Sequence, residues 1–94
     1  MIIIGETVDN YLGYHYYVTA VTDKSRHKEP YVAVDDKTDS RVARIKLRDK
    51  SIHFYSHTPS EVINDINILK TWIDKNYIKS VKAWNRNNPK YALK

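Results

Sequence analysis

Basic residues in the C-terminal third have a spacing that suits phosphate binding. At 3.6 residues per turn, four of them form one stripe along a helix, and the fifth joins it only if the helix continues past Pro89. Trp72 flanks this stripe, and its indole is of the kind that stacks on nucleic-acid bases. The pattern predicts a surface for a phosphate backbone or an acidic protein, with an ordinary solvated helix face as the alternative. The five cations are Lys75, Lys79, Lys82, Arg86 and Lys90.

The charge of the chain also favours an anionic partner. Its 94 residues include 16 Lys and Arg and 11 Asp and Glu, for a formal net charge of +5. Residues 48–94 hold nine basic and four acidic residues, whereas residues 1–47 hold seven of each. A one-sided basic excess indicates nucleic acid or an acidic protein as partner. A composition rich in Lys, Asn and Tyr because of an AT-rich genome stays open as the alternative.

Histidines and aspartates give weaker indications of metal binding. His53 and His57 are four residues apart, but they flank the end of a predicted strand, where that spacing separates them. Asp35, Asp36 and Asp39 lie in a polar turn that lacks the glycine and terminal glutamate of an EF-hand loop. We therefore predict no metal site, no cofactor and no catalytic residue.

An acid–base ribonuclease stays open as a minor alternative. Such an enzyme needs His, Tyr, Arg or Lys side chains that converge on one phosphate. Residues of these types on or beside predicted strands are His15, Tyr17, His27, Arg44 and Lys46. Their spacing alone does not bring them together, so the sequence favours a binding protein over an enzyme.

The composition excludes several other kinds of site. The chain has no cysteine, which excludes disulfides, zinc–thiolate sites and thiol nucleophiles. Two glycines are too few for a phosphate-cradling or dinucleotide-binding loop. No apolar run approaches the roughly 20 residues of a membrane span, and no signal-peptide pattern is present. We expect a cytoplasmic protein without a membrane partner, and the sequence does not predict its oligomeric state.

The first half of the chain predicts a small antiparallel sheet. Polar turns separate short segments rich in β-branched and aromatic residues. In one of them, Ala43, Ile45 and Leu47 face one way, whereas Arg44 and Lys46 face the other. The expected strands are residues 2–7, 14–23, 31–34, 41–47 and 51–55, with Asp9-Asn10 and Gly13 ending the first.

The second half predicts one long helix over residues 59–87. Thr58 is expected to cap it, Pro59 suits its first position, and Glu61 completes a capping box. Pro89 ends it, because the residue before a proline avoids helical geometry. Its apolar side consists of Val62, Ile66, Leu69, Ile73, Tyr77 and Trp84. We therefore expect one α+β domain over residues 1–94, with a sheet of four to five strands at about 2–57 and a short C-terminal tail. The first part of the helix is expected to pack on the sheet and its end to project.

Two segments resemble a known bacterial family. The segment HKEPYVAV at residues 27–34 is similar to the H-x-P-P-H-x-H-V signature of the bacterial domain-of-unknown-function family 4160. That family continues with an alternating strand, which residues 41–47 match. It ends with a helix that carries two tryptophans, as Trp72 and Trp84 do here. The resemblance covers about residues 13–86.

The resemblance implies a partner rather than a reaction. Members of the family are similar to small proteins encoded beside partner genes in toxin–antitoxin or mobile-element loci. Tyr31 and Ala33 stand where the family has histidines, so any metal binding or chemistry of those histidines is not expected here. Of the polar signature, His27 and Pro30 remain; we expect His27 in an exposed loop and Pro30 at the entry to a strand.

The favoured hypothesis is a small cytoplasmic, non-enzymatic binding protein of the phage, mobile-element or toxin–antitoxin type. It acts through its basic helix on nucleic acid or on a nucleic-acid-handling protein. The first alternative is a phage-encoded inhibitor of a host defence nuclease, similar to an anti-CRISPR protein. Its contacts are Tyr14, Tyr16 and Tyr17, because tyrosine is enriched at interfaces. The second alternative is the small ribonuclease-like toxin.

Overall fold

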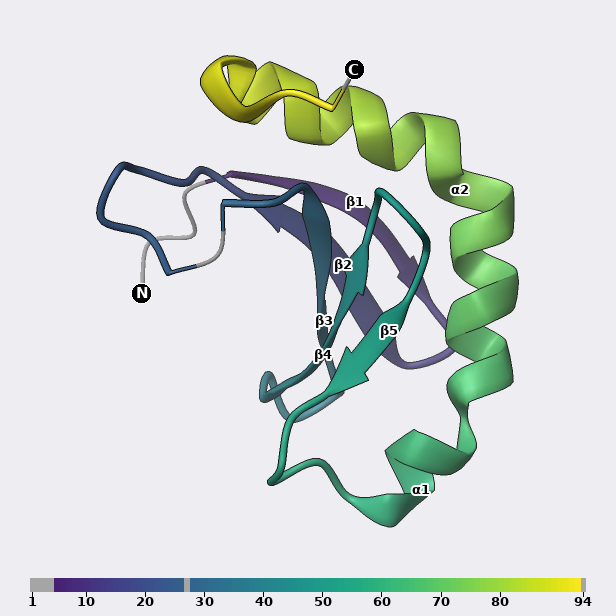
Figure 1. Ribbon diagram of the computed structural model, residues 1–94. Coiled ribbons are helices and arrows are strands. Elements are labelled where there is room, and N and C mark those ends of the chain that lie inside the picture. Colours follow the sequence, from purple (N-terminus) through teal and green to yellow (C-terminus); the bar gives the residue numbers. More distant parts are fainter. Residues whose placement is uncertain (1–4, 27, 94) are drawn as a thin grey trace.

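Five antiparallel strands precede two helices in the computed structural model, which describes residues 5–26 and 28–93 (Figure 1). This is the predicted α+β architecture. The strands are β1 (Gly5–Tyr11), β2 (Tyr14–Thr19), β3 (Tyr31–Asp35), β4 (Arg41–Lys46) and β5 (Ile52–Phe54). The helices are α1 (Ser60–Asn64) and α2 (Ile66–Asn87), followed by the 3-10 turn η1 (Pro89–Tyr91).

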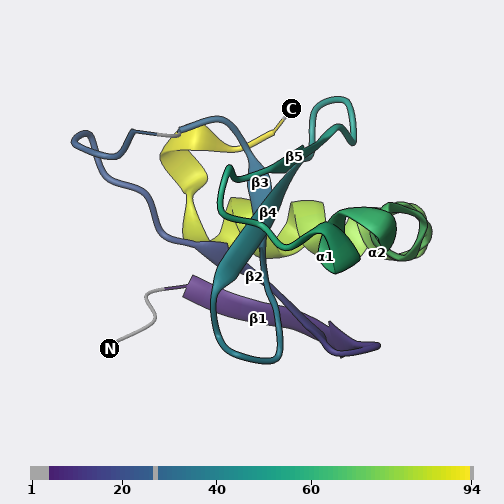
Figure 2. The same cartoon turned by 90° about the horizontal axis from the view of Figure 1, so that it is seen from below.

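Strands that are neighbours in the sequence are neighbours in the sheet, in the order β1-β2-β3-β4-β5. The first turn has positive φ at Leu12 (49°) and Gly13 (86°), as in the two-residue turns whose twist matches antiparallel strands. Because the turn lies there, Asp9 and Asn10 pair with β2 instead of forming the predicted turn. Figure 2 shows the twist of the sheet, in which the edge strands β1 and β5 point in different directions.

The face of the sheet that packs against α2, here called the inner face, holds the apolar core. Cross-strand pairing places Tyr16 beside Val34 and Val34 beside Ala43, and all three are fully buried. Leu69 and Ile73 of α2 are buried in the same core, as predicted. The predicted apolar side of the helix therefore faces the sheet except at Ile66, which is only half-buried and lies outside this core.

The predicted single helix is interrupted at two places. Asp65 separates α1 from α2, and Asn76 inside α2 has a non-helical φ of −114°. The first part of α2 runs alongside the sheet and the second part crosses the end of the sheet (Figure 1). Trp84 in this second part is fully buried, so the end of the helix packs instead of projecting.

Thr58 has a different role from the predicted helix cap. Its hydroxyl donates to the carbonyl of Val42 in β4 at 2.7 Å, and Pro59 occupies the N-cap position. The same carbonyl accepts a hydrogen bond from the amide of Tyr55 at 3.3 Å. The predicted capping box is wrong because the chain leaving β5 still lies along β4, and the threonine hydroxyl bonds there.

A buried asparagine fixes the C-terminal end of α2 to the sheet. The Asn88 side chain accepts a hydrogen bond from the amide of Val21 at 2.7 Å and donates to the carbonyl of Thr19 at 2.8 Å. The helix ends just before it, at Asn87, as predicted from Pro89. Among the described residues, no helix combines the length and apolar character that a bilayer crossing requires.

Candidate anion-binding face

The predicted helix stripe has no exposed tryptophan. Trp72 is 1% exposed, and its ring stacks on Tyr16 with the ring centroids 3.8 Å apart and the planes 6° apart. Its indole N–H donates to the Asp9 carboxylate of β1 at 2.8 Å. The prediction that Trp72 stacks on a base is therefore wrong, because the edge strand closes over the indole and places it in the core.

Two cations of the stripe are paired with acidic residues from the first half of the chain. Arg86 contacts the carboxylate of Glu6 at 2.6 Å. This hydrogen bond is the main reason that the pKa of Glu6 is lowered below its ordinary value. Lys90 lies in η1, outside α2, and contacts Asp23 at 2.9 Å. Both pairs reduce the positive charge that the predicted stripe offers to a partner.

The other three cations of the stripe lie in solvent. Lys75, Lys79 and Lys82 are exposed, and none forms an ion pair with another described residue. The kink at Asn76 separates Lys75 from the other two. The stripe is therefore reduced to three solvated lysines on a bent helix.

The three tyrosines predicted as a protein-binding surface are buried. Tyr14, Tyr16 and Tyr17 are 7%, 0% and 5% exposed. The Tyr14 hydroxyl donates to the Asp65 carboxylate at 2.7 Å, and burial raises the pKa of Tyr14. The prediction that they form the contact surface is wrong, because β2 lies inside the sheet and side chains cover it on both faces.

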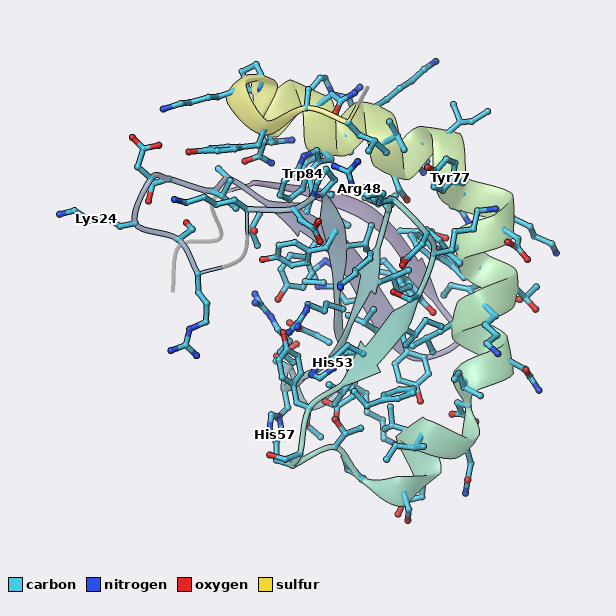
Figure 3. The ribbon with its side chains drawn as sticks, viewed as in Figure 1. Lys24, Arg48, His53, His57, Tyr77 and Trp84 are labelled. Atoms are coloured by element: carbon cyan, nitrogen blue, oxygen red, sulfur yellow. The ribbon has the colours of Figure 1, made fainter. Side chains whose placement is uncertain are left out.

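The opposite side of the sheet, here called the outer face, gathers cations and aromatic rings. Cross-strand pairing aligns Thr7, Tyr17, Ala33, Arg44 and His53 in one row across all five strands. His53 and His57 lie on the side of the sheet away from α2 (Figure 3). In the part of the chain that the structure describes, neither helix lies over the middle of this face (Figures 1 and 2), and α2 reaches its end only where Trp84 packs on Tyr31.

Arg41 is held in place on the outer face by Tyr17. Its guanidinium donates to the Tyr17 hydroxyl from Nε at 3.2 Å and from Nη2 at 3.0 Å, and lies 5.5 Å from the ring centroid. The same hydroxyl donates to the Asp35 carboxylate at 2.9 Å. Burial raises the pKa of Tyr17, so its phenol stays neutral. This arrangement fixes one guanidinium at the surface without a direct carboxylate pair.

Three rings and a second guanidinium lie beside this cluster. His53 meets the Tyr55 ring edge-on with centroids 5.5 Å apart, and His57 stacks on the Tyr55 ring with centroids 5.8 Å apart and planes at 12°. The Arg44 guanidinium lies 5.6 Å from the centroid of the Tyr55 ring. The His57 Nε2 donates to the Arg41 carbonyl at 2.8 Å. Cations beside aromatic faces are the combination that binds single-stranded nucleic acid.

A pocket of about 180 Å³ lies where the loop before β3 meets β4. Four of the six side chains around it are cationic, and one is acidic. The lining residues are Arg26, Lys28, Glu29, Tyr31, Arg44 and Lys46. Arg44 belongs both to this pocket and to the group of rings around Tyr55. The pocket therefore continues the outer face as one positively charged surface.

Four of the residues considered for a ribonuclease share the outer face, namely His15, Tyr17, Arg44 and Lys46. His15 stacks on Tyr17 with centroids 4.9 Å apart, and its Nε2 hydrogen-bonds to the Thr7 hydroxyl at 3.0 Å. Arg44 and Lys46 alternate along β4 on this face. The fifth residue, His27, lies outside the described residues. No three His, Asp or Glu side chains within the described residues lie together as metal ligands.

Sequence reasoning found part of this surface and missed the rest. It predicted that Arg44 and Lys46 face away from the core, which the strand register confirms. It missed Tyr55 and its contact with Arg44. The signal for Tyr55 was present, because His53, Tyr55 and His57 alternate, and alternate residues of an extended chain share one side.

Neither protein-family models, curated protein sequences nor solved structures gave a match to this chain. The resemblance to family 4160 therefore stays a prediction. A separate prediction, that Pro30 sets the entry to a strand, is confirmed, because β3 begins at Tyr31, directly after Pro30. The functional interpretation below depends on the geometry of the outer face.

Proposed function

We propose that this chain is a small, non-enzymatic protein that binds nucleic acid through the outer face of its sheet. The observation that supports this most is the contact of Arg44 with Tyr55 on a face whose middle no described helix covers. Cations neutralise phosphates, and aromatic rings accept unstacked bases. The proposal keeps the expected cytoplasmic setting of phage, mobile-element or toxin–antitoxin type and moves the contact from the helix to the sheet.

The cations of the outer face are better prepared for binding than those of the helix. Arg41 is already held by Tyr17, and Arg44 already lies over Tyr55. An arginine fork that is positioned in advance loses less conformational freedom when it binds a phosphate. A free lysine side chain gives up on the order of 1.5–2 kcal/mol of rotamer entropy when it is fixed. Each phosphate contact on the outer face therefore contributes more binding free energy than one on the helix.

The rings favour a single strand over a duplex. Tyr55 is half-buried, and His53 and His57 are exposed, so this group of rings is partly open to solvent beside Arg44. Bases inside a duplex are already stacked and paired, and reach a protein ring only when they are splayed out. Stacking tolerates any base, so we expect weak sequence preference and strong salt dependence.

Two contacts favour binding over the ribonuclease alternative. The Tyr17 hydroxyl accepts from Arg41 and donates to Asp35, which leaves it no proton to give to a substrate. The His15 Nε2 is occupied by the Thr7 hydroxyl. A general acid or base needs a free hydrogen-bonding position toward the reacting atom. These contacts support a structural role for both side chains.

Fluorescence anisotropy with labelled single-stranded DNA and RNA tests the proposal. The outer-face variant is Arg44→Gln with Lys46→Gln, and the matched helix variant is Lys79→Gln with Lys82→Gln. We expect the outer-face variant to lose about tenfold in affinity and about 1.4 from the salt slope, because it loses two phosphate contacts. The helix variant should bind within about twofold of wild type.

Three outcomes would contradict the proposal. One is loss of affinity in the helix variant alone, which would show that nucleic acid binds the predicted helix stripe. Another is the absence of oligonucleotide binding while a nuclease-treated lysate still yields a specific protein partner, which favours the inhibitor alternative. The third is cleavage of the RNA probe by wild type that the Arg44 variant abolishes, which favours the toxin alternative.

A further inference from the structure

We propose that the pocket between the loop before β3 and strand β4 binds the terminal phosphate of a nucleic-acid strand. We further propose that Glu29 competes with that phosphate for the pocket's cations. This inference depends on the proposed function, because it names the part of a strand that the outer face recognises. Its ligand is a phosphate monoester, which differs from the diesters along the backbone in charge and in its number of terminal oxygens.

The pocket is lined on one side by a buried tyrosine and on another by two cations at alternate positions of one strand. Tyr31 forms the wall: it is 6% exposed, its hydroxyl bonds to that of Thr19 at 3.0 Å, and its ring packs on Trp84 with centroids 5.5 Å apart. Arg44 and Lys46 project from alternate positions of β4 on the same side. Strand geometry therefore fixes the Cα positions from which the Arg44 and Lys46 side chains extend.

The charge of the pocket exceeds what one phosphodiester needs. Arg26, Lys28, Arg44 and Lys46 supply four positive charges, and Glu29 supplies one negative charge. A diester carries one negative charge, whereas a terminal phosphate carries close to two and presents three acceptor oxygens. Arginine forks bind such groups bidentately. A net charge of about +3 matches the strand end better than the strand interior.

Glu29 is placed as a weakly held competitor. Its carboxylate lies 4.0 Å from Lys46 Nζ and 3.8 Å from Arg48 Nε, and its side chain is 60% exposed. Long, exposed ion pairs of this kind contribute little free energy. A phosphate entering the pocket therefore displaces the carboxylate at small cost and takes over Lys46, the one of these two cations that lines the pocket.

Arg44 gives the bound strand a direction. It lines the pocket and also lies 5.6 Å from the centroid of the Tyr55 ring. A strand whose terminal phosphate occupies the pocket has its next nucleotides beside Tyr55, His53 and His57. The pocket therefore fixes the end of the strand, and the rings accept the bases that follow it.

The test compares one labelled single-stranded oligonucleotide in three forms: 5′-phosphorylated, 3′-phosphorylated and with hydroxyls at both ends. We expect one phosphorylated form to bind about tenfold more tightly than the hydroxyl form at moderate salt. Inorganic phosphate at millimolar concentration should remove this advantage without displacing the hydroxyl form. Equal affinity of all three forms would overturn the inference and leave the proposed function intact.

Two single substitutions in the same loop locate the effect. Lys28→Gln removes a pocket cation and should reduce the preference for the phosphorylated end to about twofold or less, with the hydroxyl form affected little. Lys24→Gln is the matched control, because Lys24 points away from the sheet (Figure 3). It should leave the preference unchanged. A preference that survives Lys28→Gln and disappears in Lys24→Gln would overturn the assignment to this pocket.

Glu29→Gln tests the competition directly. Removal of the carboxylate should strengthen binding of the phosphorylated form by about two- to threefold, since the phosphate no longer displaces an anion. Binding of the hydroxyl form should change less. Weaker binding of the phosphorylated form in Glu29→Gln would show that the carboxylate assists the ligand, which contradicts the inference. If wild type binds none of the three oligonucleotides, the proposed function fails together with this inference.

Discussion

The outer face of the sheet and the exposed side of α2 both carry cations, but they hold them differently. On the sheet, Arg41 and Arg44 lie against tyrosine rings, at 5.5 and 5.6 Å from the ring centroids. On the helix, Lys75, Lys79 and Lys82 extend into solvent without an ion pair among the described residues. The first set is positioned before any ligand arrives, and the second set is not.

Folding redistributes the positive charge that the sequence concentrates in the second half of the chain. Residues 1–47 are neutral in sum, and the basic excess belongs to residues 48–94. In the folded chain, Glu6 pairs with Arg86 and Asp23 pairs with Lys90. Acidic residues of the neutral half thus neutralise cations of the basic half. The positive surface that remains for a partner includes the outer face, whose cations come mostly from the neutral half.

The strongest test of the comparison is Trp72→Ala. Spacing assigns Trp72 to the helix surface, whereas the structure places its ring against Tyr16 in the core. We expect a loss of about 3–5 kcal/mol in the free energy of unfolding, measured by urea denaturation. Trp72→Phe should lose less, chiefly the hydrogen bond to Asp9, at about 1 kcal/mol. If Trp72→Ala keeps wild-type stability and loses oligonucleotide affinity, the helix stripe is the binding surface, as the sequence predicts.

The next largest effect is expected from Arg41→Gln. It leaves the Tyr17 hydroxyl, which donates to Asp35, without the guanidinium that donates to it. We expect a loss of about 1–3 kcal/mol in the free energy of unfolding, because part-buried polar groups lose a partner. Lys75→Gln on the helix should change it by no more than about 0.5 kcal/mol. Equal effects of the two substitutions would mean that both sets of cations are merely solvated.

A binding measurement with Tyr55→Ala sharpens the comparison. If bases stack on this ring, single-strand affinity should fall by about tenfold, whereas Tyr55→Phe should keep most of it. Tyr11→Ala is the control, since Tyr11 is an exposed tyrosine, 37% accessible, near the turn between β1 and β2. Equal losses in Tyr55→Ala and Tyr11→Ala would indicate a general effect of surface aromatics.

The smallest expected effect concerns the pair that neutralises the helix end. Because Arg86 lowers the pKa of Glu6, the pair stabilises the fold above the ordinary glutamate pKa of 4.5 and loses that contribution as the pH falls through the lowered value. The Arg86 side chain is 58% exposed and that of Glu6 is 38% exposed, so we expect only a small contribution. In thermal denaturation, wild type and Glu6→Gln should therefore differ slightly at pH 7 and converge as the pH falls below the lowered pKa of Glu6. A difference that grows at low pH would be inconsistent with this pair.

Much of the fold was predictable because it depends on local patterns. Alternation along residues 41–47 correctly separated Ala43 and Ile45 from Arg44 and Lys46. Periodicity correctly placed Leu69 and Ile73 in the core. The helix breaks at Asp65 and Asn76 were not predicted. The break at Asn76 lets α2 follow first the inner face and then the end of the sheet. That path depends on the twist of the sheet, which the helix sequence does not encode.

The candidate site was less predictable because it depends on contacts between distant segments. Helical spacing assumes that one side of a helix meets the core, but Asp9 of the edge strand also covers Trp72. The pocket requires the loop that carries Arg26 and Lys28 to lie beside β4. No local spacing indicates that approach. The sequence showed which side chains were suited to bind phosphate, and the fold determined which of them meet.

The buried Asn88 has a consequence for the order in which the protein folds. Strands adjacent in the sequence pair with each other, so the sheet closes through short-range contacts, which generally form quickly. Asn88, by contrast, joins the end of α2 to Thr19 and Val21, 69 and 67 residues earlier. During synthesis on a ribosome, the strands therefore emerge long before the residue that anchors their cover. Until Asn88 leaves the exit tunnel, α2 cannot fully cover the inner face of the sheet. The nascent chain is most prone to aggregate during this interval.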